Sequence, residues 1–443
     1  MIFFISDIGE YFNRMPYHFV RAFEYVLTNG LLNTSNSQFY IDANAIECFK
    51  NLSCECLGLF SAEVVYKTLE VCQAPLFSIP TNYADKLIEA LINIISRLPQ
   101  SEVSAAQRKI IESILNELKN VKPLAVQKSQ SFHKGIVLLS AALGAIAENA
   151  SEETWRAQKD LIKEIVEISL NGLAVFRSQE NIMLSLYLLF RRLTKVVNVH
   201  SDIFFPRLCD EIIEAYVPGK EEGMAVIIPG LSLLQNEPLT VQWLNMNYLK
   251  LFGVLYSAVS QDPCPDTITS FYDLQNKLYE SGSQLFSTTL TNVLEVTTVL
   301  ATKLHDRNSS KSLLQLCQLI FSSRADILTN YALPLTKSLL SSLETISINT
   351  YHKLSSVLNN LKLNYSSEFY QGTTLALSSE VYARFQQKEK ERLLYCFANA
   401  DTDTIHQMKQ LINIVSNILR GQGTFDSVIA VEIAINSKKL KKT

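Results

Sequence analysis

The sequence predicts an all-α fold in which antiparallel helix pairs stack into a solenoid. Two observations indicate this: apolar residues recur with helical spacing along the chain, and residues that make turns are scarce. The 443-residue chain contains 14 glycines and 12 prolines, about half the usual share of these two residues. Sandwiches, barrels and standard α/β enzymes need Gly or Pro at many connections, so long helices joined by short loops are expected instead.

The clearest helix pair is expected at residues 83–98 and 101–118. The apolar residues of the first segment follow the spacing of an amphipathic helix: Leu87, Ile88, Leu91, Ile92, Ile94, Ile95 and Leu98. Pro99 ends this helix, and Ser101 can cap the next one. Because the connection is short, the two helices are expected to form an antiparallel hairpin.

Similar patterns recur along the rest of the chain. One helix is expected from Ser151, its N-cap, through Leu173, and a helix from 205 carries Pro206 near its start, where the missing N–H costs little. Further helices are expected near 179–197, 239–260, 283–304, 309–323, 345–362, 367–386 and 401–420. The total is about twenty helices with a pair period of about 40 residues, which is typical of HEAT repeats. We therefore expect a continuous HEAT-repeat array of about ten pairs over residues 1–436 and a basic disordered tail at 437–443.

Composition excludes several other classes of protein. With 47% hydrophobic and 19% charged residues, the chain is not intrinsically disordered. The net charge of −3 argues against a dedicated nucleic-acid binder, which usually has a basic excess. The first twelve residues lack the basic region and cleavage site of a signal peptide, and no uncharged apolar stretch is long enough to span a membrane. A soluble intracellular protein is therefore expected.

No catalytic or metal-binding constellation is visible. The six histidines are scattered without zinc-ligand spacing. Cys54 and Cys56 point to opposite sides of a helix, so shared metal ligation is poor and buried packing is the better interpretation. The usual Gly-rich nucleotide signatures and the GxSxG motif of hydrolases are missing. The sequence therefore predicts a binding protein without cofactor, metal or enzymatic activity.

The first half of the chain resembles a known family. The segments that carry the resemblance are Ser6-Asp-Ile-Gly-Glu10, Phe12-Asn-Arg-Met-Pro16, Tyr25-Val-Leu27, Gly30-Leu31, the Ala- and Cys-containing segment 43–56, Ala90 to Pro99, and Phe205-Pro-Arg-Leu208 through Tyr216. They resemble the karyopherin-β nuclear transport receptors, especially the group of transportin-SR and importin-thirteen. Members of this family are about twice as long, so the resemblance implies that the chain corresponds to their C-terminal half.

The resemblance implies a right-handed superhelix of HEAT repeats that carries protein cargo through nuclear pores. The implied partners are protein cargo, the Phe-Gly-repeat nucleoporins and the GTPase Ran, whose main binding surface in the family lies on N-terminal repeats that this chain lacks. The implied location is the cytoplasm and nucleus. Neither membrane insertion nor direct nucleic-acid binding is implied.

One segment is a candidate for cargo binding. Transportin-SR presents an Arg-rich helix to phosphorylated Arg-Ser domains, a use of bidentate guanidinium–phosphate pairs. The corresponding segment here has an apolar centre, which argues against such cargo. Its basic residues are Arg177, Arg191, Arg192 and Lys195. They either contact other cargo or only favour the dipole of a helix C-terminus. The alternative function for the whole chain is a cytosolic HEAT scaffold or adaptor without transport activity.

Overall fold

The structure is a computed structural model. It describes residues 5, 9–31, 43–73, 81–120, 128–147, 155, 158–196, 204–233, 237–401 and 405–442. Within these ranges every regular element is a helix and none is a strand, which confirms the all-α prediction. Packing divides the chain into two compact units. Unit 1 comprises Met1–Ala215 and Ala225–Val241, and unit 2 comprises Tyr216–Met224 and Gln242–Thr443.

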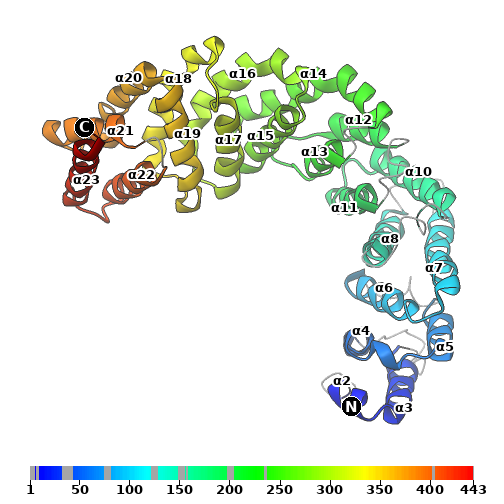
Figure 1. Cartoon of the computed structure of the whole chain (residues 1–443). Coiled ribbons are helices and arrows are strands. Elements are labelled where there is room, and N and C mark those ends of the chain that lie inside the picture. Colours follow the sequence, from blue (N-terminus) through cyan, green and yellow to red (C-terminus); the bar gives the residue numbers. More distant parts are fainter. Residues whose placement is uncertain are drawn as a thin grey trace. The chain divides into compact units, whose positions relative to one another are not determined.

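Unit 1 consists of helices in two rows (Figure 1). The first row contains α4 (Ala43–Glu55), α6 (Thr81–Ile95), α8 (Ser129–Ala147) and α11 (Glu180–Val196). The second row contains α3 (Tyr17–Val26), α5 (Ala62–Gln73), α7 (Gln100–Asn120), α10 (Lys159–Val175) and α12 (Phe205–Ala215). The short α2 (Gly9–Arg14) precedes them and α13 (Met224–Leu233) follows.

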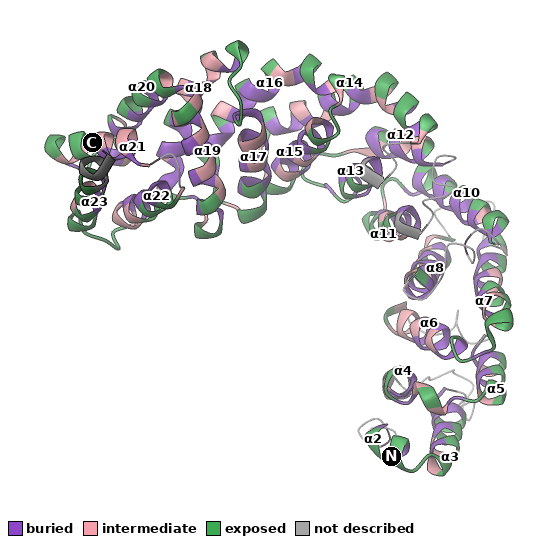
Figure 2. Ribbon diagram, viewed as in Figure 1, coloured by how far each residue is buried: buried purple, intermediate pink, exposed green. Residues whose placement is uncertain are grey.

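Unit 2 repeats this arrangement. Its first row contains α15 (Pro265–Glu280), α17 (Arg307–Ile320), α19 (Tyr351–Asn364) and α22 (His406–Leu419). Its second row contains α14 (Pro238–Gln261), α16 (Gln284–Leu300), α18 (Asp326–Ser341) and α20 (Ser366–Leu377). The helices α21 (Gln387–Asn399) and α23 (Asp426–Lys442) complete the unit. In each unit the buried residues lie where the two rows face each other (Figure 2).

The helices form because each has an apolar face that the neighbouring row covers. In α6 the residues predicted to be apolar and inward are buried, among them Leu87, Leu91 and Ile95. Pro99 lies in the turn to α7, as predicted. At the start of α17, Asp306 accepts the backbone N–H groups of Asn308 and Ser309 at 2.8 and 3.0 Å. These hydrogen bonds favour the carboxylate and lower the pKa of Asp306, which is the expected behaviour of an N-cap.

The period of the repeat is visible in hydrogen bonds between successive pairs. Glu47 on α4 pairs with Lys86 on α6, and Cys54 accepts from Asn93; both pairs are 39 residues apart in the chain. In unit 2, Tyr279 donates to the Leu319 carbonyl across 40 residues. These separations confirm the predicted pair period of about 40 residues. That the array is continuous over residues 1–436 stays a prediction.

The structure differs from the prediction at several boundaries. The segment expected as one helix at 367–386 is broken after Leu377 and includes a 3-10 turn, Glu380–Tyr382. The cause is tertiary, because the fully buried Tyr382 donates its hydroxyl to the Leu340 carbonyl of α18 at 2.8 Å. The expected cap Ser151 lies outside the described residues, and α10 begins at Lys159.

The expected disordered tail is also different. Residues 437–442 continue α23 to Lys442. Lysine tolerates helix well, and positive charge near the C-terminus of a helix is favoured by its dipole.

One described helix, α8, is long and apolar enough by length and composition to cross a membrane. Most of its residues are buried against α6, α7 and α11. This environment is that of a central helix in a stacked array.

Candidate protein-binding surfaces

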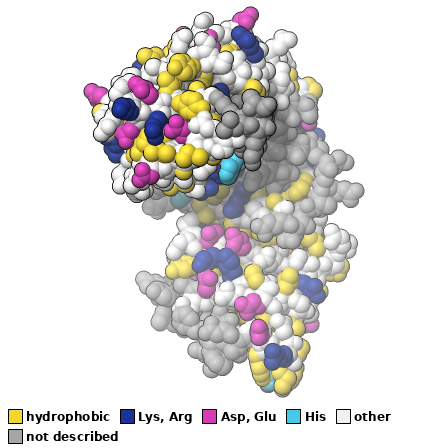
Figure 3. Space-filling view, turned by 60° about the vertical axis from the view of Figure 1, so that its left-hand side comes forward, with side chains coloured by type: hydrophobic (Ala, Val, Ile, Leu, Met, Phe, Trp, Pro, Cys, Tyr) yellow, Lys and Arg dark blue, Asp and Glu magenta, His cyan; other side chains and the backbone are white. Residues whose placement is uncertain are grey.

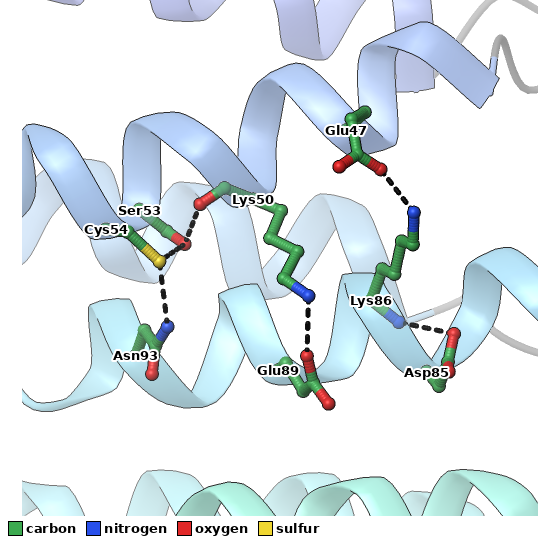
Figure 4. A network of polar contacts seen from close by, with 8 residues as sticks. All are labelled: Glu47, Lys50, Ser53, Cys54, Asp85, Lys86, Glu89 and Asn93. Atoms are coloured by element: carbon green, nitrogen blue, oxygen red, sulfur yellow. Dashed lines mark hydrogen bonds and ion pairs between the residues drawn. The ribbon is translucent and has the colours of Figure 1, made fainter. Parts of the chain in front are cut away.

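The first row of unit 1 carries a ladder of polar pairs between α4 and α6 (Figure 4). Lys50 pairs with Glu89 at 3.0 Å, and this hydrogen bond raises the pKa of Lys50. About a third of each side chain is exposed, so the pair contributes about 0–1 kcal/mol. The side chains pair with one another along the two helices. The ladder therefore fixes how α4 and α6 align and does not present unpaired charges to a partner.

Two of the four predicted cargo residues are held by contacts within the protein. Arg177, in the turn after α10, donates to Glu211 at 2.7 Å and lies 3.3 Å from Glu214. The hydrogen bond to Glu211 raises the pKa of Arg177. Arg192 is half-buried and donates to the backbone carbonyl of Ser140 on α8. Arg177 therefore connects the turn after α10 to α12, and Arg192 connects α11 to α8.

Arg191 is arranged differently. Its side chain is exposed on α11, and the described part of the chain offers it no carboxylate partner. Leu184 and Leu188 are 38% and 46% exposed, and their spacing from Arg191 places all three on one face of α11. Lys195 also lies on α11, but its side chain is outside the described residues. The structure thus shows an exposed stripe of two leucines and one arginine, which we call the α11 stripe.

Sequence reasoning missed the leucines of the α11 stripe. They belong to the apolar centre of the segment, which suggested burial. The signal that could have found them is their register. Residues 184, 188 and 191 are spaced by four and three, so an exposed Arg191 predicts that the two leucines share its solvent-facing side.

A half-buried histidine lies beside this stripe. His133 on α8 is 2.9 Å from the hydroxyl of Ser185 on α11, through its Nε2 atom. Burial lowers the pKa of His133, because the imidazolium loses hydration. The hydrogen bond between the neutral imidazole of His133 and the Ser185 hydroxyl connects α8 to α11, the helix that carries the α11 stripe.

The second row of unit 1 contains a pocket of about 180 Å³ between α10 and α12. Its lining combines apolar and charged residues: Lys159, Ile162, Lys163, Val166, Glu167, Phe204 and Arg207. Arg207 donates to Glu167 at 2.7 Å across the two helices.

In unit 2 the second row is almost uncharged. From Gln242 onward, α14, α16, α18 and α20 carry five charged residues among 65, a much smaller share than the 19% of the whole chain. Several large apolar side chains on these helices are exposed: Met246, Leu249, Val299, Ile327, Tyr370 and Leu375. We call these six residues, which lie on four helices of the second row, the neutral face.

Other surfaces of unit 2 are charged. In its first row, Glu280 on α15 accepts from Gln315 on α17 at 3.0 Å, and Lys353 on α19 donates to the same Gln315 at 3.2 Å. Towards the C-terminal end, charged residues of both signs intersperse with apolar ones (Figure 3). The low charge of the neutral face is therefore not general to the unit.

In the part of the chain that the structure describes, we find no set of side chains arranged as a catalytic site. There, no group of three or more His, Cys, Asp or Glu side chains is placed to hold a metal ion. Burial raises the pKa of Cys72 and Cys317 to about 12, which keeps these thiols protonated and unreactive.

Comparison with known proteins supports the fold. No protein-family model and no curated protein matches the chain. Among solved structures, the chain is similar to importin13 in its cytosolic state, with a TM-score of 0.65 and 12% sequence identity. The similarity covers 94% of this chain and 49% of that one, so the chain spans about half the length of the structure it matches. The chain therefore has the HEAT-repeat solenoid fold of an importin, as its sequence predicts.

Proposed function

We propose that this protein is a carrier of the karyopherin type, which binds protein cargo and accompanies it between cytoplasm and nucleus. The observation that carries the proposal is the importin fold along 94% of the chain. A curved stack of helix pairs offers large partners an extended surface without needing a deep pocket. The residue-level resemblance in the first half of the chain supports the transportin-SR and importin-thirteen group, and the C-terminal half in particular.

The α11 stripe is the proposed cargo surface. Leu184 and Leu188 supply apolar area, and Arg191 supplies a charge that can form a bidentate pair with a carboxylate of the cargo. Arg177 and Arg192 are proposed to support this surface through their internal contacts rather than to touch cargo.

The neutral face is the proposed contact for Phe-Gly-repeat nucleoporins. These repeats present phenylalanine side chains on an otherwise uncharged chain. A surface with few charges and exposed side chains such as Met246 and Leu249 lets such rings pack without stripping water from charged groups.

Binding to immobilised Phe-Gly repeats tests the proposal. The intact chain should bind, and replacing Met246 and Leu249 by Ser should weaken binding without changing the helical circular dichroism. The matched control is Leu184→Ser with Leu188→Ser, which removes similar apolar area from the proposed cargo surface and should leave repeat binding unchanged.

The alternative function, a cytosolic HEAT scaffold, makes the opposite prediction. A scaffold should not bind Phe-Gly repeats, and a fluorescent fusion should stay out of the nucleus. GTP-loaded Ran should bind weakly or not at all if the chain corresponds to the C-terminal half. Tight GTP-dependent Ran binding would refute that correspondence, while failure to bind the repeats would refute the carrier proposal.

A further inference from the structure

The pocket between α10 and α12 is not used by the proposed function. Its apolar part is formed by Ile162 and Val166 of α10 and by Phe204, which precedes α12. All three side chains are at least nine-tenths buried. The volume of about 180 Å³ exceeds that of apolar cavities of about 150 Å³ that accommodate a benzene ring. One aromatic or large aliphatic side chain therefore fits.

The rim of the pocket is basic. Lys159 and Lys163 are exposed, and their spacing of four places them on one face of α10. Neither lysine has a carboxylate partner among the described residues.

The acidic residues nearby are mostly engaged. Glu167 is bound by Arg207 at 2.7 Å, and Glu164 is bound by Lys119 of α7 at 2.6 Å. Asp160 is exposed and adjoins Lys159 in sequence. With Lys159, Lys163, Arg207 and Glu167, the lining carries two more positive than negative charges.

We propose that this pocket binds an acidic segment of a partner protein that carries one aromatic or large aliphatic side chain. The apolar side chain enters between Ile162, Val166 and Phe204, and flanking carboxylates pair with Lys159 and Lys163. A neutral segment would fill the cavity but leave both lysines without a partner, so charge complementarity favours the acidic one. The proposal does not depend on a role in nuclear transport.

The test uses the intact chain and short fluorescent peptides. The first peptide has one Phe flanked on both sides by Asp and Glu. The second replaces these acids by Asn and Gln, and the third replaces Phe by Ala. Fluorescence anisotropy should show binding of the first peptide. Loss of the acids should weaken binding by about three- to tenfold, and loss of the Phe ring should weaken it by about tenfold or more. Binding should also weaken as salt is added, because the lysines are exposed.

The protein variants complete the test. Replacing Lys159 and Lys163 by Glu should weaken the first peptide by about tenfold or more, with unchanged circular dichroism. The control, Lys303→Glu with Lys388→Glu, makes the same change in net charge at two exposed lysines of unit 2 and should leave binding unchanged.

Three results would overturn the proposal. The neutral Phe peptide binding as tightly as the acidic one would show that charge plays no part. Equal effects of the two variant pairs would show that only net charge matters. Self-association of the intact chain, abolished by the Lys159 and Lys163 changes but not by the control, would assign the pocket to a second copy of the chain.

Discussion

His133 is a residue whose burial makes stability depend on pH. Its usual pKa is 6.5, and burial lowers it in the folded protein. At a pH just below 6.5 the unfolded chain binds a proton that the folded chain does not, so stability falls as pH decreases below 6.5 and is unaffected by this group above it.

Replacing His133 by Gln removes this titration while keeping a polar partner for Ser185. The urea midpoint of the variant should therefore fall less than that of the unchanged protein when pH is lowered through 6.5. His352→Gln, at an exposed position of α19, is the control. Equal pH dependence in the His133 variant and the unchanged protein would contradict the assignment.

Glu221 is a buried carboxylate in unit 2 without a cationic partner among the described residues. Its Oε1 atom accepts from the Tyr216 hydroxyl at 2.6 Å and from the Thr267 hydroxyl at 2.7 Å, while its Oε2 atom accepts no hydrogen bond from any described residue. The contacts fasten the segment Tyr216–Met224 to α15.

Two changes at Glu221 separate hydrogen bonding from charge. Glu221→Gln keeps an accepting oxygen for both hydroxyls, so stability should be largely kept. Glu221→Ala leaves two hydroxyls without their acceptor and should cost about 1–3 kcal/mol. Urea denaturation measures both, and equal losses in the two variants would show that the charge itself is needed.

At the residue scale, the sequence predicted the site only in part. It indicated that the basic residues of 177–195 either contact cargo or favour a helix dipole, and among them Arg191 is exposed. It could not show that Arg177 and Arg192 are bound by Glu211 and the Ser140 carbonyl, because those partners lie more than thirty residues away and depend on how helices pack.

At the scale of single helices, two glycines in helix interiors should respond oppositely to alanine. A Cβ atom at Gly172 of α10 would lie 2.3 Å from the ring of the buried Phe132, and such overpacking costs about 1–3 kcal/mol. Apart from the backbone of its own helix, no described atom would lie within 4 Å of a Cβ atom at Gly253 of α14. There alanine should gain up to about 1 kcal/mol through better helix propensity.

Thermal unfolding followed by circular dichroism checks this pair. Gly172→Ala should lower the midpoint and Gly253→Ala should raise it. A rise for both variants would mean that the packing of α10 against α8 adapts to the extra methyl group.

The sequence predicted helices better than their ends. Segments with strong 3.6-residue periodicity, such as α6 and α7, were predicted within a few residues. The break between α20 and α21 was missed. Tyr382 in this segment donates to the Leu340 carbonyl of α18, a long-range contact that local propensity does not reveal.

At the scale of the whole molecule, the two units should unfold in separate steps. Contacts are concentrated within each unit, and stacked repeats depend mainly on their neighbours. Gly172→Ala lies in unit 1, whereas Gly372→Ala lies in unit 2, where its Cβ would be 2.7 Å from the Leu333 carbonyl.

Calorimetry should therefore show two transitions, each lowered by one of these two variants. A single transition lowered equally by both would show that the units are thermodynamically coupled.

The regular spacing of contacts also bears on how the chain folds during synthesis. Hydrogen bonds between repeats mostly join residues about 40 positions apart, such as Asn13 with Glu55 and Tyr395 with Asn436. These short loops give a low contact order, which favours rapid folding. Each helix pair can therefore dock on the preceding one while the ribosome is still adding the next. The last pairs are an exception: Arg420 on the C-terminal side of α22 binds carbonyls of Glu344 and Ile346, more than seventy positions earlier. These hydrogen bonds can form only after α22 has been synthesised. The helices around Glu344, Ile346 and Arg420 are therefore the last to reach their native packing.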